Sequence, residues 1–355
     1  MPLLPGDSIP FFIARTPSNP RFVFDQAAGR YLVLAFLPRE RSAAAAAIQA
    51  VRERRHIFDD QRCTFFGVLR DPAAIAEAVE EPPGIYWILD ADGEASKAFQ
   101  IEEKDAELGR WIVLDPTVRV LLTAPLSALE VLDQVAALPS ADNHAGTRLH
   151  APALIVPRVF EPAMCQRLIA LYEANGGQSS GFMVEVDGQT VEVHQPSGKR
   201  RSDFWIDDDT LKSELNARLL RWLAPSIAKA FQFTPTRIER HLVSCYDAKD
   251  AGFFRAHRDN TTKATAHRRF AVTLNLNADD YEGGDLRFPE FGSATYRAPT
   301  GGAIVFSCSL LHEAEPVTRG RRYAFLPFLY DEAGAKIREA NSGFLASNPG
   351  AYGAG

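Results

Sequence analysis

The first part of the chain alternates short apolar runs with segments of helical character. A continuous apolar run is typical of a buried strand, and an alanine-rich segment has the strongest intrinsic helix propensity. Strand-like and helix-like segments follow one another at residues 31–38, 41–56, 63–71, 72–81 and 85–93. Strands that alternate with helices predict an α/β layer in which part of the strand pairing is parallel.

The pattern changes after residue 109. Residues 110–125 contain two apolar runs on either side of a turn, which predicts a hairpin. Residues 126–138 have the spacing of an amphipathic helix that closes the layer. The stretch 139–152 is polar and rich in helix and strand breakers, and it predicts a linker.

Residues beyond 152 predict a second kind of architecture. Helices are expected at 161–175 and 210–231, and a hairpin at 183–193 around the favoured turn Asp187-Gly188. Many short apolar runs, separated by Gly, Pro and Asp turns, fill residues 238–331. Short strands at even spacing predict an antiparallel barrel or jelly roll. We therefore expect domains at 1–138 and 153–332, joined by the linker 139–152, and a loosely held tail at 333–355.

Composition narrows the class of protein. The chain has 355 residues, of which 46% are apolar and 24% charged, and its formal net charge is −6. This acidic balance argues against a general nucleic-acid-binding surface, and the basic run Lys199–Arg201 is interpreted as a solvated loop. Four widely spaced cysteines without a CxxC pair favour reduced thiols. The N-terminus lacks a signal-peptide pattern, and the longest apolar runs are too short to cross a membrane, so a cytoplasmic protein is expected.

The N-terminal part resembles the peroxiredoxin branch of the thioredoxin fold. The resemblance rests on residues 5–12 (PGDSIPFF), 29–38, 89–99 and 109–120. Members of that branch carry Pro-x-x-x-Thr/Ser-x-x-Cys after the second apolar strand, and here the frame that starts at Pro38 places Ala45 where the cysteine would stand. The thiolate is the nucleophile in that chemistry. We therefore expect a redox-inactive scaffold, and Cys63 is interpreted as a buried small apolar residue.

The C-terminal part contains three residue types that suit a metal. His257 and Asp259 are two positions apart in a strand-like segment, and alternation along a strand would place both side chains on one face. His312 ends a later apolar run, SCSLLH. Two histidines and one carboxylate form the facial triad that holds non-haem Fe(II) and leaves positions open. No cysteine is placed so as to favour zinc.

Residues 151–330 look like the prolyl-4-hydroxylase-like branch of the Fe(II)/2-oxoglutarate oxygenases. The resemblance rests on the order HxD…H…R together with the segments SCYDAKDAGFFRAHRDN, RRFAVTLNLN, YEGGDLRFPE and GGAIVFSCSLLHEAEPVTRGRRYAF. It implies a double-stranded β-helix (jelly roll) with flanking helices, so that the fold class of the whole chain is α+β with two domains. It also implies that His257, Asp259 and His312 ligate Fe(II).

The same resemblance implies a site for 2-oxoglutarate. The far carboxylate of this cosubstrate needs a fixed cationic fork, which an arginine supplies. Arg322 lies ten residues after His312 and fits by spacing; Arg321 is the rival, but adjacent strand residues point to opposite faces. Tyr246 and Asn275 match positions where the family places further cosubstrate-binding groups. The remaining histidines near these motifs are interpreted as surface or satisfied core residues: His194, His241 and His267.

The implied reaction couples oxidative decarboxylation of 2-oxoglutarate to hydroxylation of an unactivated C–H bond, with release of succinate and CO2. Fe(II), 2-oxoglutarate and O2 are the expected cofactors, with ascorbate as a further candidate. The expected substrate is a prolyl or similar residue of a protein or peptide, and residues 176–204 stand where such enzymes carry a mobile substrate loop.

Two alternatives remain open: an oxygenase of free amino acids or other metabolites, and a binding module that senses oxygen or 2-oxoglutarate. No nucleic-acid or membrane partner is expected. Formation of a homodimer through the N-terminal part also stays open.

Overall fold

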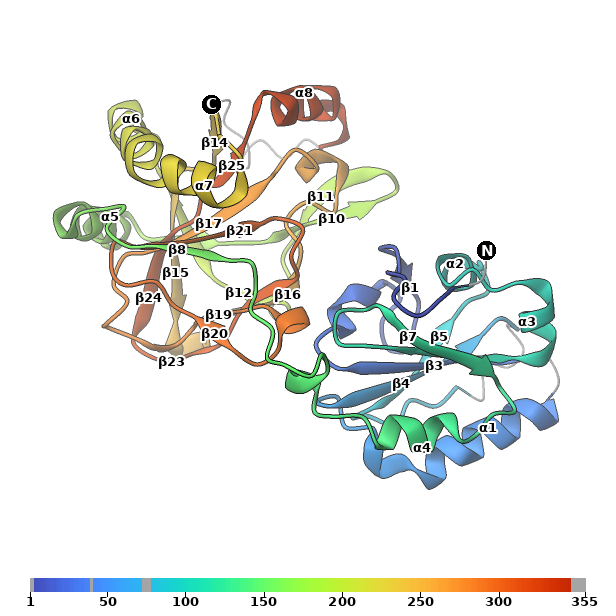
Figure 1. Ribbon diagram of the computed structural model, residues 1–355. Helices are drawn as coiled ribbons and strands as arrows, with labels where there is room; N and C mark the ends of the chain where they lie inside the picture. Colours follow the sequence, from blue (N-terminus) through green and yellow to red (C-terminus); the bar gives the residue numbers. More distant parts are fainter. Residues whose placement is uncertain (1–2, 39–40, 72–77, 346–355) are drawn as a thin grey trace. The chain divides into compact units, whose positions relative to one another are not determined.

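The computed structural model describes residues 3–38, 41–71 and 78–345, and the chain divides into two compact units (Figure 1). The first unit contains Met1–Ala151 together with Pro289–Ser293, and the second contains Pro152–Phe288 and Ala294–Gly355.

The first unit is built around a five-stranded sheet with the strand order β5-β4-β3-β6-β7. Strands β3, β4 and β5 pair in parallel, and β6 and β7 form the antiparallel hairpin that the sequence predicts. The strands of the unit are β1 (Ile13–Ala14), β2 (Phe22–Val23), β3 (Tyr31–Phe36), β4 (Cys63–Leu69), β5 (Ile85–Leu89), β6 (Arg110–Leu114) and β7 (Val120–Pro125), and its helices are α1 (Arg41–Glu53), α2 (Glu94–Ala98), α3 (Glu103–Leu108) and α4 (Val131–Ala136).

Both faces of this sheet are covered by apolar side chains. Helices α1 and α4 pack on one face, where Val51 and Val135 join Val33, Phe65 and Trp111 in one core (Figure 1). The other face carries a cluster of aromatic rings: Phe12, Phe24, Phe36, Phe66 and Phe99. Strand β3 is buried along its whole length, as expected of a central strand in a parallel region.

The second unit contains a nine-stranded and a five-stranded sheet, together with two-stranded ribbons. Its helices are α5 (Pro162–Asn175), α6 (Asp209–Arg218), a π-helical stretch (Leu219–Leu223), α7 (Ala224–Phe231) and α8 (Glu332–Ala340). Its strands are β8 (Leu154–Val156), β9 (Gln178–Ser179), β10 (Phe182–Val186), β11 (Gln189–Val193), β12 (Lys199–Arg200), β13 (Ser202–Trp205), β14 (Arg237–Glu239), β15 (Leu242–Asp247), β16 (Phe253–His257), β17 (Phe270–Asn275), β18 (Glu282–Gly283), β19 (Leu286–Arg287), β20 (Thr295–Tyr296), β21 (Ala303–Ser307), β22 (His312–Ala314), β23 (Val317–Arg319), β24 (Arg321–Phe325) and β25 (Phe328–Tyr330).

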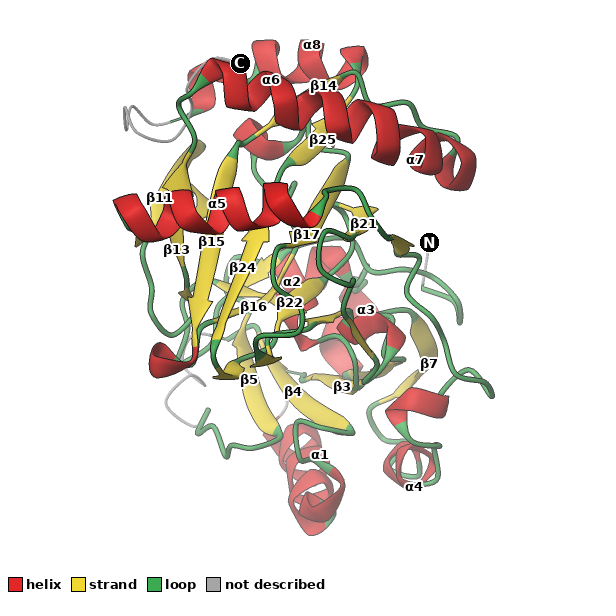
Figure 2. Cartoon of the chain, turned by 90° about the vertical axis from the view of Figure 1, so that its left-hand side faces the viewer, coloured by secondary structure: helices red, strands yellow, loops and turns green. Residues whose placement is uncertain are grey.

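The two faces of the large sheet differ in chemistry. One face packs against α5, α6 and α7, through alternate strand residues such as Val243, Leu274 and Phe325; Figure 2 shows α5 running across this face. Because side chains alternate along a strand, the residues in between point to the other face. That face carries polar and charged groups, among them Tyr246 and Arg322, and it positions the candidate site.

Several predicted elements agree with the structure and several differ. The hairpin at 183–193 is present as β10 and β11, with Val186 opposite Gln189 across the turn. The closing helix of the first part is shorter than predicted, because only α4 is helical within 126–138.

The predicted loose tail instead contains α8. This helix begins where the Asp331 side chain accepts a hydrogen bond from the backbone N–H of Gly334.

Some predictions fall outside the described residues. These are most of the helix expected at 72–81, two positions of the peroxiredoxin-like frame (Arg39 and Glu40), and the last ten residues of the tail. Within the described part, no helix is both long and apolar enough to cross a membrane.

Candidate active site

Strand pairing brings the two candidate histidine ligands together. His257 is the last residue of β16 and His312 is the first residue of β22, and the two stand directly opposite each other in the antiparallel register. Residues opposite one another project to the same face of a sheet. Their ring centroids are 4.3 Å apart, so two side chains far apart in the sequence are neighbours in the fold.

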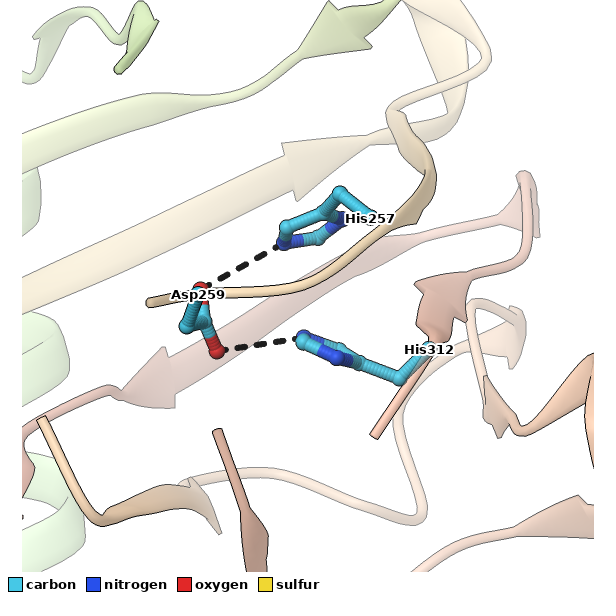
Figure 3. A group of neighbouring side chains, drawn as sticks. All are labelled: His257, Asp259 and His312. Atoms are coloured by element: carbon cyan, nitrogen blue, oxygen red, sulfur yellow. Dashed lines mark ion pairs between the residues drawn. The ribbon is translucent and has the colours of Figure 1, made fainter. Parts of the chain in front are cut away.

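Asp259 reaches the same point from a turn and not from the strand. Strand β16 ends at His257, so the prediction that alternation along one strand aligns His257 with Asp259 is wrong. The backbone N–H of Asp259 instead donates to the Cys308 carbonyl at 2.9 Å. The Asp259 carboxylate lies 3.5 Å from Nε2 of His257 and 3.4 Å from Nε2 of His312 (Figure 3).

The hydrogen bonds of the two rings fix which nitrogen faces the carboxylate. Nδ1 of His257 lies 2.7 Å from the Arg255 carbonyl oxygen, and Nδ1 of His312 lies 3.0 Å from the Leu310 carbonyl oxygen. A carbonyl only accepts, so each Nδ1 carries the hydrogen and each Nε2 keeps its lone pair. One ligand atom from each of the three residues lies within 4.8 Å of the others. Two imidazoles and one carboxylate are a donor set that suits Fe(II).

Burial and neighbouring side chains set the protonation states of His312 and Asp259. Burial and, as a smaller cause, the neighbouring His257 lower the pKa of His312 to about 4, so His312 is neutral at pH 7. For Asp259, burial alone would raise the pKa, but His312 and His257 outweigh this and hold the pKa below its usual range. Metal binding requires neutral imidazole and ionised carboxylate. His312 and Asp259 are therefore in the protonation states that bind a cation at neutral pH.

Arg322 is a buried cation, and neighbouring side chains leave two of its nitrogens without a partner. The side chain is 2% exposed, and Nε and Nη1 have no hydrogen-bond partner. The backbone approaches it closely at Gly284, where φ is +68° and a Cβ would lie 3.2 Å from Cδ of Arg322. Arg321, by contrast, points outward and pairs with Glu173 at 2.9 Å and Asp247 at 3.3 Å. The two arginines point to opposite sides, as strand alternation predicts.

Tyr246 and Asn275 share the inner face with Arg322. Tyr246 stands directly opposite Arg322 in the β15–β24 register, and the guanidinium lies 4.9 Å from its ring centroid. Asn275 donates from Nδ2 to the Ala298 carbonyl at 2.8 Å, while its Oδ1 is buried and has no partner. Two of these predicted cosubstrate residues thus carry buried polar atoms that no other described side chain satisfies.

A small apolar cluster connects the two groups of residues. Tyr246 packs in one cluster with Ala314 of β22 and with Phe254 of β16. Phe254 stacks on the His257 ring with the centroids 3.5 Å apart. Two aromatic side chains therefore connect the sites: Tyr246 lies beside Arg322, and Phe254 lies beside His257.

The prediction of surface or satisfied core positions holds for His194 and His241, and for His267 only in part, because the buried Nδ1 of His267 has no partner among the described residues. His267 is fully buried, with Nε2 2.6 Å from Glu239, and His241 lies 2.7 Å from the Asn216 side-chain oxygen. His194 is about half exposed and pairs with Glu192 at 3.6 Å.

The interpretation of the basic run Lys199–Arg201 as a solvated loop is wrong. Lys199 is 7% exposed and Arg201 is 9% exposed, and only Arg200 between them points outward. Their burial depends on partners distant in the sequence, such as Tyr246, and a short charge run contains no signal for it.

Comparison with known proteins places the candidate site in a recognised sequence family. Residues 241–330 match the model of the 2OG-Fe(II) oxygenase superfamily. The matched range contains all six candidate residues: His257, Asp259, His312, Arg322, Tyr246 and Asn275.

Two curated relatives are similar to part of the chain. A PKHD-type hydroxylase of Stutzerimonas stutzeri is 28% identical over 148 residues, which cover 39% of this chain and 64% of that protein. A PKHD-type hydroxylase of a Synechococcus species is 38% identical over 96 residues, which cover 25% of this chain and 42% of that protein. The chain thus spans less than two thirds of the length of either relative.

Among solved structures, a prolyl hydroxylase of Trichoplax adhaerens in complex with a hypoxia-inducible-factor peptide is 19% identical. The match has a TM-score of 0.40 and covers 53% of this chain and 86% of that chain. By its sequence, the C-terminal part of the chain contains a 2OG-Fe(II) oxygenase domain.

Proposed function

We propose that the protein is an Fe(II)- and 2-oxoglutarate-dependent dioxygenase that hydroxylates an unactivated C–H bond and releases succinate and CO2. The family match over residues 241–330 supports this activity. The observation that carries the proposal is the combination of a two-histidine, one-carboxylate cluster with a buried arginine that has no counter-ion among the described residues.

His257, Asp259 and His312 would hold the metal. Their ligand atoms face one another, and the backbone carbonyls bound to both Nδ1 atoms keep the rings in that orientation. When bound, the metal supplies activation of oxygen, and three protein ligands leave coordination positions open for that purpose.

Arg322, Tyr246 and Asn275 would bind 2-oxoglutarate. A buried guanidinium without a counter-ion destabilises the fold by several kcal/mol, unless an anion binds to it. The far carboxylate of 2-oxoglutarate would supply the negative charge and hydrogen-bond acceptors that the unpaired Nε and Nη1 of Arg322 lack. Arg321 is excluded from this role because its guanidinium is already paired with Glu173 and Asp247 at the surface.

The proposed substrate is a prolyl or similar residue of a protein or peptide. The names of the PKHD-type relatives and of the Trichoplax enzyme motivate this choice, and the hairpin β10–β11 stands where a substrate loop is expected. An oxygenase of free amino acids or other metabolites is the second candidate. A sensing module is the third, and it is disfavoured because a module without chemistry has no need of all four groups of the metal and arginine set.

The domain assignment belongs to the same proposal. Residues 1–138 would form a thioredoxin-like domain, 139–152 a linker, and 153–332 a jelly-roll oxygenase domain followed by α8. The strand order β5-β4-β3-β6-β7 with its mixed pairing supports the first domain, and the antiparallel sheets support the second. Ala45 is exposed on α1 and offers no thiol, while burial raises the pKa of the Cys63 thiol to about 12. The first domain would therefore be redox-inactive.

Succinate formation from 2-oxoglutarate tests the function. The Fe(II)-loaded protein and its His257→Ala variant are compared with host lysate separated into macromolecular and small-molecule fractions. Stimulation of the wild type alone by the large fraction is the expected result and would identify a protein or peptide substrate. Stimulation by the small fraction would identify a metabolite oxygenase. Equal succinate formation by both proteins in every fraction would contradict the proposed activity.

A further inference from the structure

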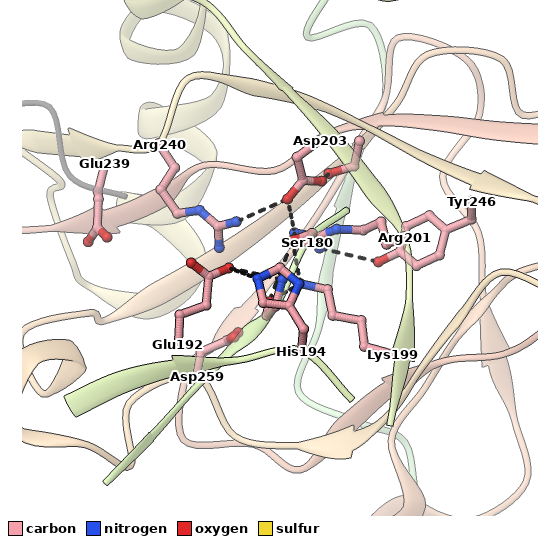
Figure 4. Close-up of polar contacts among 12 residues, drawn as sticks. Ser180, Glu192, His194, Lys199, Arg201, Asp203, Glu239, Arg240, Tyr246 and Asp259 are labelled. Carbon is pink, nitrogen blue, oxygen red and sulfur yellow. Dashed lines mark hydrogen bonds and ion pairs between the residues drawn. The ribbon is translucent and has the colours of Figure 1, made fainter. Parts of the chain in front are cut away.

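A second group of buried cations lies beside the proposed metal centre. The chain crosses from the small sheet to the large sheet at Arg201, because β12 pairs with β16 and β13 pairs with β15. Lys199 and Arg201, on either side of the outward-pointing Arg200, project into the interior, and Figure 4 shows their polar contacts.

Lys199 is separated from the candidate metal centre by one aromatic ring. Its ammonium lies 4.7 Å from the Phe254 ring centroid, and Phe254 is the residue that stacks on His257. The ammonium donates to Ser180 Oγ at 2.7 Å and to the Gly181 carbonyl at 2.5 Å. Both acceptors are uncharged, and an ammonium has three N–H donors. One donor of Lys199 is therefore left for another acceptor.

Arg201 connects the same region to the proposed cosubstrate site. Its Nη2 donates to Asp203 at 2.6 Å and to Ser180 at 3.2 Å, and its Nη1 lies 3.4 Å from the Tyr246 hydroxyl (Figure 4). The guanidinium is 5.8 Å from the Tyr246 ring centroid, and Arg322 is 4.9 Å from the same centroid. Nε of Arg201 is buried without a partner. A second N–H donor is thus left over in this cluster.

Lys199 is the cation of this cluster for which the described residues supply no carboxylate partner. The Asp203 carboxylate is shared by Arg201, by Arg240 at 3.7 Å and by the Ser244 hydroxyl at 2.6 Å. Within the described chain, no carboxylate lies at ion-pair distance from the Lys199 ammonium. The other nearby acid, Glu192, accepts from the Gly181 N–H at 2.9 Å and pairs with His194.

The Lys199 ammonium is thus a buried group with only uncharged acceptors, and a bound carboxylate would supply the missing counter-ion. Burial lowers the pKa of Lys199, and the adjacent Arg201 lowers it further. A bound anion would reverse this effect.

We propose that Lys199 and Arg201 form a subsite for a carboxylate of the primary substrate, distinct from the Arg322 site for 2-oxoglutarate. The substrate would then be an acid, either a free carboxylic acid or an acidic residue beside the hydroxylated position of a peptide. This inference rests on the proposed function and names the substrate class. In this subsite, the leftover donor of each residue would bind one oxygen of the carboxylate.

Binding of matched acids and amides tests the subsite. The full chain is loaded with Mn(II), which does not turn over, and with saturating 2-oxoglutarate, and ligand affinity is measured by calorimetry. The probes are L-proline against L-prolinamide, and the capped peptides Ala-Pro-Glu-Ala against Ala-Pro-Gln-Ala. At least one acid is expected to bind about 10-fold or more tightly than its amide, because a buried charge loses its partner in the amide. If the acid binds more tightly only in the proline pair, the substrate is a free acid; if only in the peptide pair, it is an acidic peptide.

Variants locate the discrimination. Lys199→Met and Arg201→Gln should each abolish the preference for acid, and the matched control Arg200→Gln, on the same strand but facing outward, should keep it. Lys199→Arg retains the charge and should keep much of the preference that Lys199→Met loses. This comparison separates recognition of charge from a structural role of Lys199 at the base of the hairpin. An unchanged Mn(II) affinity shows that each variant is folded.

Several outcomes would overturn the subsite: no acid binds better than its amide, the preference survives in both variants, or saturating 2-oxoglutarate abolishes it. The last outcome would mean that the cations serve the cosubstrate. The same titration without metal or 2-oxoglutarate separates this inference from the proposed function. Acid preference in a protein that fails to bind Mn(II) would remove the oxygenase proposal and leave the subsite standing.

Discussion

The two units of the chain use their sheets in opposite ways. In the N-terminal unit, apolar side chains cover both faces of the sheet, and burial raises the pKa of its thiol at Cys63 to about 12. In the C-terminal unit, one face of the large sheet is apolar, whereas the other carries Asp203, Tyr246 and Arg322. Burying charge opposes folding unless partners or ligands compensate for it. The interior that carries such charges is therefore where we place the function.

The largest expected effect is the loss of metal from the C-terminal unit. Asp259→Ala and His312→Ala each remove one of three ligands, and we expect Fe(II) affinity to fall by more than about 100-fold, since even outer residues of metal sites contribute 10–100-fold. Equilibrium dialysis against Fe(II) under anaerobic conditions measures this. His56→Ala, an exposed histidine of the N-terminal unit, is the control and should bind Fe(II) like the wild type. Equal affinities in all three variants would place the metal elsewhere.

The next effect concerns the core of the N-terminal unit. Phe65 is 1% exposed and its ring lies against Phe58, Trp87 and Trp111. Phe65→Ala should lower the free energy of unfolding of this unit by about 3–5 kcal/mol, because it leaves a cavity between large rings. Calorimetry should show the transition of the N-terminal unit moving to lower temperature, while succinate formation, assayed well below that transition, stays within about twofold of the wild type. A parallel loss of turnover would mean that the units do not act independently.

A smaller effect separates the two adjacent arginines of β24. Arg322→Ala should raise the KM for 2-oxoglutarate by about 30-fold or more, because it removes the partner of a buried carboxylate, an interaction of about 2–5 kcal/mol. Arg321→Ala should change it by less than about twofold, since an exposed ion pair contributes about 0–1 kcal/mol. Steady-state kinetics of the two variants check this. Similar KM values for the two variants would contradict the assignment of Arg322, and not Arg321, as the residue that binds 2-oxoglutarate.

The smallest expected effect is a difference in acid sensitivity. Burial alone would raise the pKa values of Asp203 and Glu239, but Arg201 and Arg268 outweigh this and hold both below the usual range. In the unfolded chain these carboxyls take up protons near pH 4, whereas in the folded unit they do not. Their contribution to stability is therefore present above about pH 4.5 and is lost as the pH falls further.

Calorimetry between pH 7 and pH 3.5 measures this difference. The C-terminal transition should lose roughly 1–3 kcal/mol more than the N-terminal one. In the N-terminal unit, burial of Asp59 is likewise outweighed, mainly by backbone N–H donors, and its pKa is lowered. Equal losses in the two units would show that the buried carboxylates do not distinguish them.

Some parts of the fold follow directly from the sequence. The alternating runs before residue 94 correspond to β3, α1, β4 and β5, and the turn Asp187-Gly188 adopts the positive φ values that its two-residue hairpin requires. Strand alternation alone also separates Arg321 from Arg322. These features depend on local pattern, which a single sequence contains.

Other parts of the site depend on pairing between distant strands. The register that places His257 opposite His312, and Tyr246 opposite Arg322, arises from β16–β22 and β15–β24 contacts that no local pattern encodes. The burial of Lys199 has the same origin, because its neighbours Ser180 and Phe254 come from other elements. A charge run looks solvated until the elements that enclose it are known.

The most direct measurement is a single turnover of the full chain. Anaerobic protein with one equivalent of Fe(II) and excess 2-oxoglutarate, with and without the stimulating lysate fraction, is mixed with oxygen, and succinate is quantified. We predict oxygen-dependent succinate, up to about one per iron in the presence of the fraction, from the wild type and from Cys63→Ala, and none above background from Asp259→Ala. Succinate formation that is independent of Asp259, or its absence in the wild type under every condition, would contradict the assignment of oxygenase chemistry to the C-terminal unit.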